Sequence, residues 1–268
     1  MNVVGMTDME REALVELLLQ LGDDDFIYAF RGAEWLGLAP HIEEDVASAS
    51  ISQNSMGHAV MFYELAEALG LEEANVLAHG RSAKERRNSV LVERVNGEGS
   101  YMGTPTFDWA YTVVRNYFYT LAKKLKMDAL QKSSYEPLVD VAKKVNMELH
   151  YHLMHWRTWF VQLLQSTEEA KEKMIRAIEA VMQDFGDLID YGHLAKEIET
   201  KAYIAPASEV ETRWMDIMKP IVESLGLSRN LLQYEQQRNG RNKEHTADLE
   251  EAIATLSEVY RADPVASW

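Results

Sequence analysis

The chain has 268 residues, of which 47% are apolar and 26% are charged, and its formal net charge at pH 7 is −16. The apolar content supports a substantial core and excludes a disordered chain. An acidic surface repels the phosphates of nucleic acids and of anionic membranes, so we expect neither as a partner. The lack of cysteine excludes disulfides, iron–sulfur clusters and a thiol nucleophile.

The predicted elements, in chain order, are almost all helices. Glycine and proline are scarce, with 14 and 6 residues, while straight-chain residues that favour helices are plentiful. Helices are expected over residues 9–21, 26–36, 43–69, 107–127, 135–164, 167–184, 208–225 and 244–261. Asp23 to Asp25 are expected to form a turn with capping character between the first two helices. The segment 70–107 is expected to be irregular, with a possible short strand over 89–94.

The order of these helices predicts a fold. A helix pair, one long crossover and a second helix pair are the arrangement of a ferritin-like four-helix bundle. No internal repeat, low-complexity tract or linker divides the sequence. We therefore predict an all-α, ferritin-like four-helix bundle with additional peripheral helices, formed by residues 1–268 as a single domain. The helices over 43–69, 107–127 and 135–164 should lie at its centre.

The N-terminal region and the apolar runs predict a cytoplasmic protein. Residues 1–12 contain acidic side chains and lack the basic region and apolar stretch of a signal peptide. No apolar run approaches the ~20 residues that a transmembrane helix needs. Neither an export signal nor a membrane span is therefore expected.

Ferritin-like proteins that bind two iron ions carry a recognisable motif on their core helices. Two helices each supply one Glu and two others each supply Glu-x-x-His, because residues three apart share a helix face. None of the eight histidines has a glutamate three residues before it. The di-iron signature is absent, so we expect no iron or other cofactor to be bound by this chain.

Several polar residues on the predicted helices nevertheless resemble the remains of a di-iron site. Asn54 and His58 lie on the third helix, while Glu148, His152 and His155 share one face of a later helix. The vestigial di-iron-site candidates are Glu34, Asn54, His58, Thr120, Glu148 and His152. They form either an atypical metal site or a buried polar network in which Glu148 and His152 are bonded to each other. Crowded carboxylates without a cation repel one another, which favours the polar network.

Two other features each have two interpretations. Residues 47–59 are rich in Ala, Ser and Gly, which lets a neighbouring helix approach closely or leaves room for a cofactor. Close packing is the commoner reason. Lys84, Arg86 and Arg87 could contact a phosphate, but a short run of charges is usually a solvated surface.

Segments along nearly the whole chain, in order, resemble the C subunits of the bacterial phenylacetyl-CoA epoxidases, which are ferritin-like proteins. They are Ala33-Glu34-Trp35-Leu36-Gly37, Ala39-Pro40, Glu43-Glu44-Asp45, Arg87-Asn88, Leu91-Val92-Glu93-Arg94, Asn96-Gly97, Thr112-Val113-Val114-Arg115, Glu148, Tyr151-His152-Leu153, His155, Thr167-Glu168-Glu169, Gly240-Arg241, His245-Thr246, Leu249, Arg261, Pro264 and Trp268. By this resemblance, His58 stands where Gln is usual, Asn54 where Asp is usual, and Thr120 where an acidic residue is usual. The candidate site has therefore diverged from the family's pattern.

The resemblance implies a non-catalytic structural subunit of a di-iron monooxygenase that epoxidises the ring of phenylacetyl-CoA in aerobic phenylacetate catabolism. It implies that the di-iron centre lies in a catalytic A subunit with which this chain pairs. We also expect a homodimer in isolation, with the peripheral helices and Trp268 as contact candidates. The alternative is a divergent ferritin-like oxidase or oxygenase with an atypical metal site of its own at Glu34, His58, Glu148 and His152.

Overall fold

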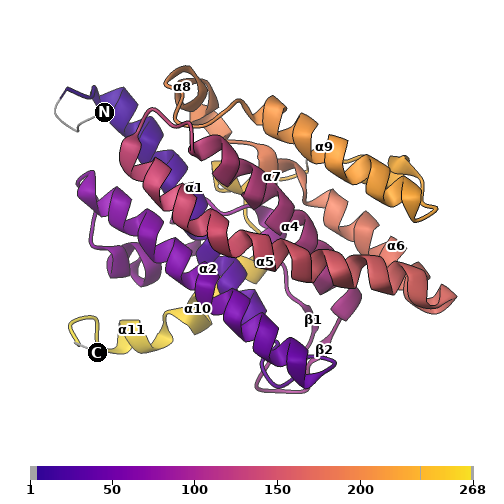
Figure 1. The fold of residues 1–268 in the computed structure, drawn as a ribbon. Coiled ribbons are helices and arrows are strands. Elements are labelled where there is room, and N and C mark those ends of the chain that lie inside the picture. Colours follow the sequence, from indigo (N-terminus) through magenta and orange to yellow (C-terminus); the bar gives the residue numbers. More distant parts are fainter. Residues whose placement is uncertain (1–4, 236, 267–268) are drawn as a thin grey trace.

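The computed structural model describes residues 5–235 and 237–266, and helices dominate it (Figure 1). The α-helices are α1 (Asp8–Ala33), α2 (Ile42–Ala68), α3 (Val90–Glu93), α4 (Trp109–Leu130), α5 (Glu136–Ser166), α6 (Glu168–Gln183), α7 (Gly186–Ile189), α8 (Ala195–Thr200), α9 (Ala207–Ser224), α10 (Ala247–Leu256) and α11 (Glu258–Ala262). The other elements are the π-helix η1 (Val76–Gly80), the 3-10 helices η2 (Ala83–Glu85), η3 (Gly192–Leu194), η4 (Arg229–Leu232) and η5 (Gly240–Asn242), and the strands β1 (Gly97–Glu98) and β2 (Thr106–Phe107). The predicted all-α, ferritin-like fold is confirmed. Within residues 5–235 and 237–266, no helix is long and apolar enough to cross a membrane.

Helices α1 and α2 form the first pair and pack along most of their length. α1 begins with a capping box, in which Thr7 Oγ1 accepts from the Glu10 amide and the Glu10 carboxylate accepts from the Thr7 amide. It then continues without a break through Asp23–Asp25. The predicted turn at these aspartates is wrong, and the two helices expected around it are one. The aspartates are tolerated within α1 because each has buried cationic or hydrogen-bonding partners, described below.

Small residues allow α1 and α2 to approach closely. A Cβ atom added at Gly32 would lie 2.2 Å from the hydroxyl of Ser52, and one added at Gly22 would lie 2.7 Å from the ring of Tyr63. A larger residue at either glycine would therefore force Ser52 or Tyr63 to move. Ser52 belongs to the small-residue stretch 47–59, so close packing accounts for its size.

The crossover between the two helix pairs covers residues 69–108 and contains η1, η2, α3 and the antiparallel hairpin β1–β2. The short strand predicted over 89–94 is wrong, because Val90–Glu93 form the helix α3. Carboxylates rather than a neighbouring strand satisfy this backbone. The Ser89 amide donates to Asp24 at 2.7 Å, and the Val90 amide donates to Asp187 at 2.8 Å.

Helices α4 and α5 form the second pair. Asp108 caps α4 by accepting from the Tyr111 amide. α5 runs beside α2 across the near face of the molecule in Figure 1, and side chains of α5 contact α2 at three levels. The predicted central helices thus correspond to α2, α4 and α5.

The peripheral helices α6 and α9 agree with the predictions over 167–184 and 208–225. The helix predicted over 244–261 is instead divided into α10 and α11, which meet at the buried Ser257. Residues 239–246 precede α10, and within them residues 239–241 and Thr246 are buried while residues 242–244 are exposed. Trp268 lies outside the described residues, so its predicted docking is untested.

Candidate functional site at the bundle centre

Four central helices each place one charged or polar side chain at the same point. α1 contributes Asp25, α2 contributes His58, α4 contributes Lys123 and α5 contributes Glu148. Lys123 Nζ lies 2.5 Å from Asp25 Oδ1 and 2.8 Å from His58 Nδ1. The other ring nitrogen of His58 lies 2.8 Å from Glu148 Oε2. The centre of the bundle is therefore a continuous chain of contacts that joins four helices.

A second pair lies one turn away on α2 and α5. Asn54 of α2 donates to Nε2 of His152 on α5 at 3.2 Å. The predicted bond between Glu148 and His152 is wrong, since Glu148 bonds His58 instead. Glu148 also does not lie in the interior: 45% of its side chain is exposed, whereas His58 and His152 are buried.

Burial keeps both histidines neutral at pH 7. Desolvation, reinforced by the nearby Lys123, holds the pKa of His58 far below its usual range. The same causes lower the pKa of His152 to about 3. A neutral His58 can accept from the Lys123 ammonium at Nδ1 and donate its Nε2–H to Glu148, which matches both contacts.

Lys123 and Asp25 form an ion pair in the core. Burial lowers the pKa of Lys123, an effect that the negative charge of Asp25 opposes. Burial likewise raises the pKa of Asp25, against the attraction of Lys123. The Tyr119 hydroxyl donates to Asp25 at 2.8 Å, which favours the ionised carboxylate. The pair is thus supported by hydrogen bonds on both sides.

The remaining sequence candidates are not part of this arrangement. Glu34 lies at the C-terminal end of α1, where it accepts from Arg31 at 3.0 Å and from Asn96 at 2.9 Å. It lies more than two helical turns from Asp25 along α1, so the structure does not bring it to His58. Thr120 is buried on α4, one turn before Lys123.

The residues at the centre do not fit a di-iron site. Such a site takes four carboxylates and two histidines from the four helices. Here the cation Lys123 stands among two carboxylates, and the two histidines lie at different levels of α2 and α5. Across residues 5–235 and 237–266, His, Asp and Glu side chains form no group of three or more suited to holding a metal.

Asp23 and Asp24 organise a separate buried network that the sequence analysis missed. Asp23 accepts from Tyr63, from both Arg81 and Arg86, and from the backbone amide of residue 87. Asp24 forms two hydrogen bonds with Arg241 at 2.8 and 2.7 Å. Arg86 is fully buried, so the interpretation of the 84–87 cluster as a solvated surface is wrong for this residue.

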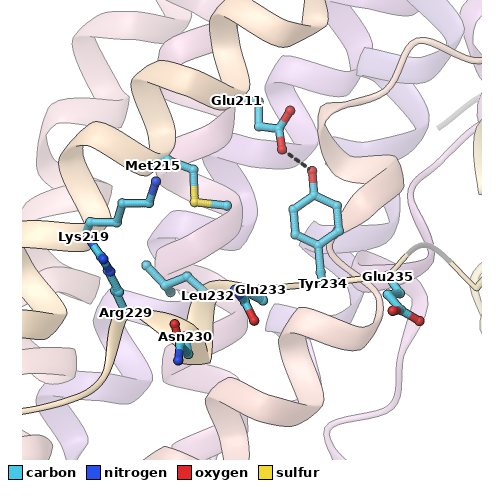
Figure 2. A pocket seen from close by; sticks show the side chains of 9 residues that line it. All are labelled: Glu211, Met215, Lys219, Arg229, Asn230, Leu232, Gln233, Tyr234 and Glu235. Carbon is cyan, nitrogen blue, oxygen red and sulfur yellow. Dashed lines mark hydrogen bonds between the residues drawn. The ribbon is translucent and has the colours of Figure 1, made fainter.

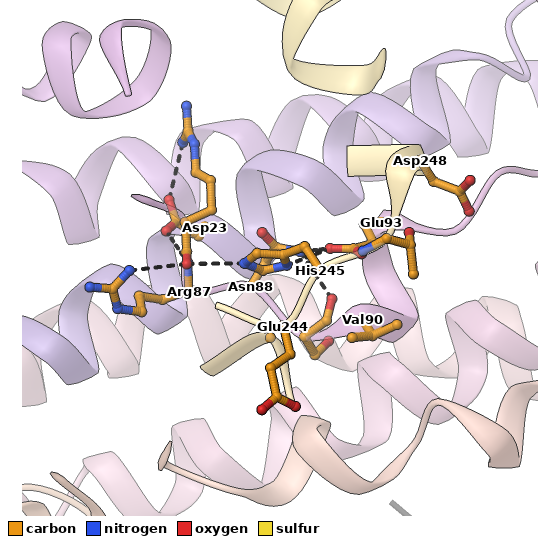
Figure 3. Close-up of polar contacts among 12 residues, drawn as sticks. Asp23, Arg87, Asn88, Val90, Glu93, Glu244, His245 and Asp248 are labelled. Carbon is orange, nitrogen blue, oxygen red and sulfur yellow. Dashed lines mark hydrogen bonds and ion pairs between the residues drawn. The ribbon is translucent and has the colours of Figure 1, made fainter. Parts of the chain in front are cut away.

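The same network holds the segment that leads into α10 (Figure 3). His245 Nδ1 lies 2.8 Å from Glu93 Oε2, and the Thr246 amide donates to the other oxygen of Glu93 at 2.6 Å. Asp187 accepts from the Gly240 amide at 2.8 Å, while burial raises the pKa of Asp187 to about 7. These hydrogen bonds to buried carboxyl groups connect residues 240–246 with α3 and α7, which fixes this segment against the bundle.

Open cavities lie elsewhere on the molecule. One of about 790 Å³ lies between α9 and residues 229–235, where Tyr234 donates to Glu211 at 2.6 Å (Figure 2). It shares no residue with the bundle centre. A small internal cavity of about 10 Å³ adjoins Asp25 and Lys123, and its size suits a single water molecule. This cavity is therefore too small for a substrate.

The fold and its centre define a ferritin-like bundle whose four central helices meet at a lysine instead of at paired Glu-x-x-His motifs. The chain belongs to the family described as phenylacetic acid catabolic protein, which matches residues 2–268. It is 27% identical over 258 residues to the C subunit of 1,2-phenylacetyl-CoA epoxidase from Escherichia coli (strain K12), covering 95% of this chain and 99% of that protein. It is 22% identical over 228 residues to the A subunit of the same epoxidase, covering 83% and 70% of the two chains. The family resemblance predicted from the sequence is confirmed.

Proposed function

We propose that this chain is the C-type partner subunit of a phenylacetyl-CoA epoxidase, and that it contributes structure to the complex while the di-iron centre lies in an A-type subunit. The observation that carries the proposal is the centre of the bundle, where Lys123 is bonded to Asp25 and His58. The match to the Escherichia coli C subunit over nearly all of both chains supports the same assignment. The chain itself would bind no cofactor.

The alternative, an oxidase with its own atypical metal site, has less support. It required Glu34, His58, Glu148 and His152 to act together. Glu34 is engaged with Arg31 and Asn96 instead, and Glu148 and His152 contact different residues of α2. An ammonium beside His58 also opposes the approach of a metal cation.

A partner subunit needs a docking surface, and α5 offers a candidate. Met147, Tyr151 and Met154 are 68%, 66% and 56% exposed and follow one another at helical spacing on one face. Met154 also helps to line a surface groove of about 680 Å³, together with Leu153 and Val161 of the same helix. We assign this face to the A-type subunit, because the half-exposed Glu148 on the same helix would place the partner directly over the bundle centre.

Co-expression with the A-type subunit, followed by size-exclusion chromatography, tests the proposal. The two chains should elute together, and the complex should epoxidise phenylacetyl-CoA faster than the isolated A-type subunit does. This chain by itself should elute as a homodimer, and elemental analysis of it should find no stoichiometric iron. Separate elution, with undiminished activity of the isolated A-type subunit, would contradict the assignment. About two irons per chain after aerobic reconstitution would favour the oxidase instead.

A further inference from the structure

Lys123 lies between two side chains of types that bind metals in other proteins. Its ammonium contacts one carboxylate oxygen, from Asp25 on α1, and one imidazole nitrogen, from His58 on α2. Oxygen and imidazole nitrogen are the donors that divalent transition metals bind in proteins. Lys123 reaches them from a third helix, α4.

The groups behind these two donors have the arrangement that supports metal ligands. The ring nitrogen of His58 that faces away from Lys123 lies 2.8 Å from Glu148, and Asp25 accepts from Tyr119 at 2.8 Å. A metal-binding histidine usually donates its second N–H to a carboxylate, and ligating carboxylates are themselves hydrogen-bonded. The contacts of Glu148 with His58 and of Tyr119 with Asp25 fix the orientation of both donors, whatever cation lies between them.

We propose that the Lys123 ammonium is a built-in substitute for a divalent cation, and that this one side chain closes an otherwise preorganised transition-metal site formed by Asp25 and His58. Replacing Lys123 by a carboxylate would remove the cation and add a third donor. The resulting site would bind a single divalent transition metal through Asp25, His58 and the new carboxylate, with Glu148 supporting the histidine. This inference concerns the chain alone and does not rest on the pairing with an A-type subunit.

The substitution Lys123→Glu tests the inference, with Co²⁺ as the probe. The visible d–d absorption of Co²⁺ shifts and strengthens when protein ligands replace its water, so binding can be titrated directly. The variant should bind about one Co²⁺ per chain, with an affinity about 100-fold above that of the wild type. Lys124→Glu is the matched control, since it makes the same charge change at the next residue, whose amine pairs with Asp128 near the surface. It should bind Co²⁺ no better than the wild type.

A second variant tests whether Glu148 supports His58 as a metal ligand. Adding Glu148→Gln to Lys123→Glu should weaken Co²⁺ binding by about 10-fold to 100-fold, because the carboxylate that orients His58 is then neutral. An equal affinity in the two variants would mean that Glu148 does not support the site.

Lys123→Glu places a third acid at the bundle centre, beside Asp25 and Glu148, so the metal-free variant could fail to fold. Far-UV circular dichroism with and without Co²⁺ covers this case, because a metal that binds only the folded chain restores it. Lys123→Met, which is neutral and of similar length, provides a further measurement: Co²⁺ should raise its melting temperature and leave that of the wild type unchanged. The inference is wrong if neither variant responds to Co²⁺ more than the wild type and Lys124→Glu do, or if the wild type itself binds Co²⁺ as tightly as Lys123→Glu.

Discussion

Arg241 and Asp24 show how a charge can be held in the core at the scale of single residues. Both are buried, and the guanidinium donates to both oxygens of Asp24, to the carbonyl of Asp187 and to that of Arg87. A bidentate pair whose guanidinium makes four hydrogen bonds offsets the cost of desolvating the two charges. Removing only one partner leaves the other charged and buried, which is the costly situation.

Arg241→Met should therefore destabilise the protein by roughly 3–5 kcal/mol. Urea unfolding followed by circular dichroism measures this. Arg213→Met is the control: the side chain of Arg213 is 42% exposed and lies 3.9 Å from Asp128, so its loss should cost less than about 1 kcal/mol. The double variant Arg241→Met with Asp24→Asn should be more stable than the sum of the single effects predicts. Strict additivity would show that the two residues do not act as a pair.

Glu148→Ala should have a smaller effect at the bundle centre. The buried His58 loses its only carboxylate at Nε2, which costs roughly 1–3 kcal/mol for an unsatisfied group. The cost should fall at the lower end, because the half-exposed site lets water replace Glu148. Thermal melting measures the change. Glu172→Ala, at an exposed position of α6, should alter the stability by less than about 0.5 kcal/mol. An unchanged melting temperature for Glu148→Ala would count against the contact.

The candidate site was only partly predictable at the residue scale. His58, Glu148, Asn54 and His152 were found because histidines and acids at helical spacing on core helices are recognisable. Which of these residues bond each other was not predicted correctly, since spacing within one helix does not fix which residue of another helix lies opposite. Lys123 was missed because a single lysine in a helix is ordinary in sequence, and only its burial makes it unusual.

At the scale of elements, α1 shows where local sequence signals fail. Three consecutive aspartates are poor helix formers and typical of turns or caps, which predicts a break at Asp23. Successive residues of a helix point about 100° apart, so the three carboxylates reach three different neighbours. Asp23 bonds Arg86 in the crossover, and Asp24 bonds Arg241 in the segment before α10. Asp25 bonds Lys123 on α4. Tertiary ion pairs, invisible in the local sequence, keep the helix whole.

The segment 240–246 is an element whose attachment should depend on pH. Burial lowers the pKa of His245, but the hydrogen bond and charge of Glu93 outweigh it and raise the pKa above the usual 6.5. Because the folded-state pKa lies above the unfolded value, the stability from this pair is complete below pH 6.5 and is lost as the pH rises through the folded value. The C-terminal region should thus be held most tightly in mildly acidic solution.

His245→Gln tests this dependence. The difference in unfolding free energy between wild type and His245→Gln should be larger at mildly acidic pH than at mildly alkaline pH. Using the difference removes contributions common to both proteins, such as that of Asp187. His150→Gln, at an exposed position of α5, controls for the change of residue type. A difference that stays constant across this range would mean that the contact with Glu93 is not ionic.

At the scale of the whole molecule, the fold follows from the sequence more readily than the site does. The single long crossover between the helix pairs was predicted from a stretch without helical periodicity. The structure has it as residues 69–108, although the strand predicted within it is a helix. Helix order tolerates such local errors, because the apolar faces of α2, α4 and α5 each carry many residues. A polar centre depends on a few side chains and has no such redundancy.

At the same scale, we expect the exposed face of α5 to determine how this chain binds an A-type subunit. A stable subunit interface buries well above about 1,000 Å², and its central apolar side chains carry most of the binding energy. Tyr151 and Met154 are exposed here although large apolar side chains on a soluble surface are usually scattered singly, and they lie at the spacing with which one helix packs on another. A charge in this position would be desolvated on docking without a partner, which strongly opposes association. Met154→Glu should therefore weaken the complex with the A-type subunit by at least about 10-fold, a cost of about 1.4 kcal/mol, measured by calorimetric titration. Val259→Glu on α11 places the same charge at another exposed apolar residue, 64% accessible, and should leave the affinity unchanged. Both variants alter only exposed side chains, so each should have a melting temperature close to that of the wild type.

If the A-type subunit binds Met154→Glu as tightly as it binds Val259→Glu, the partner docks on another face of this chain.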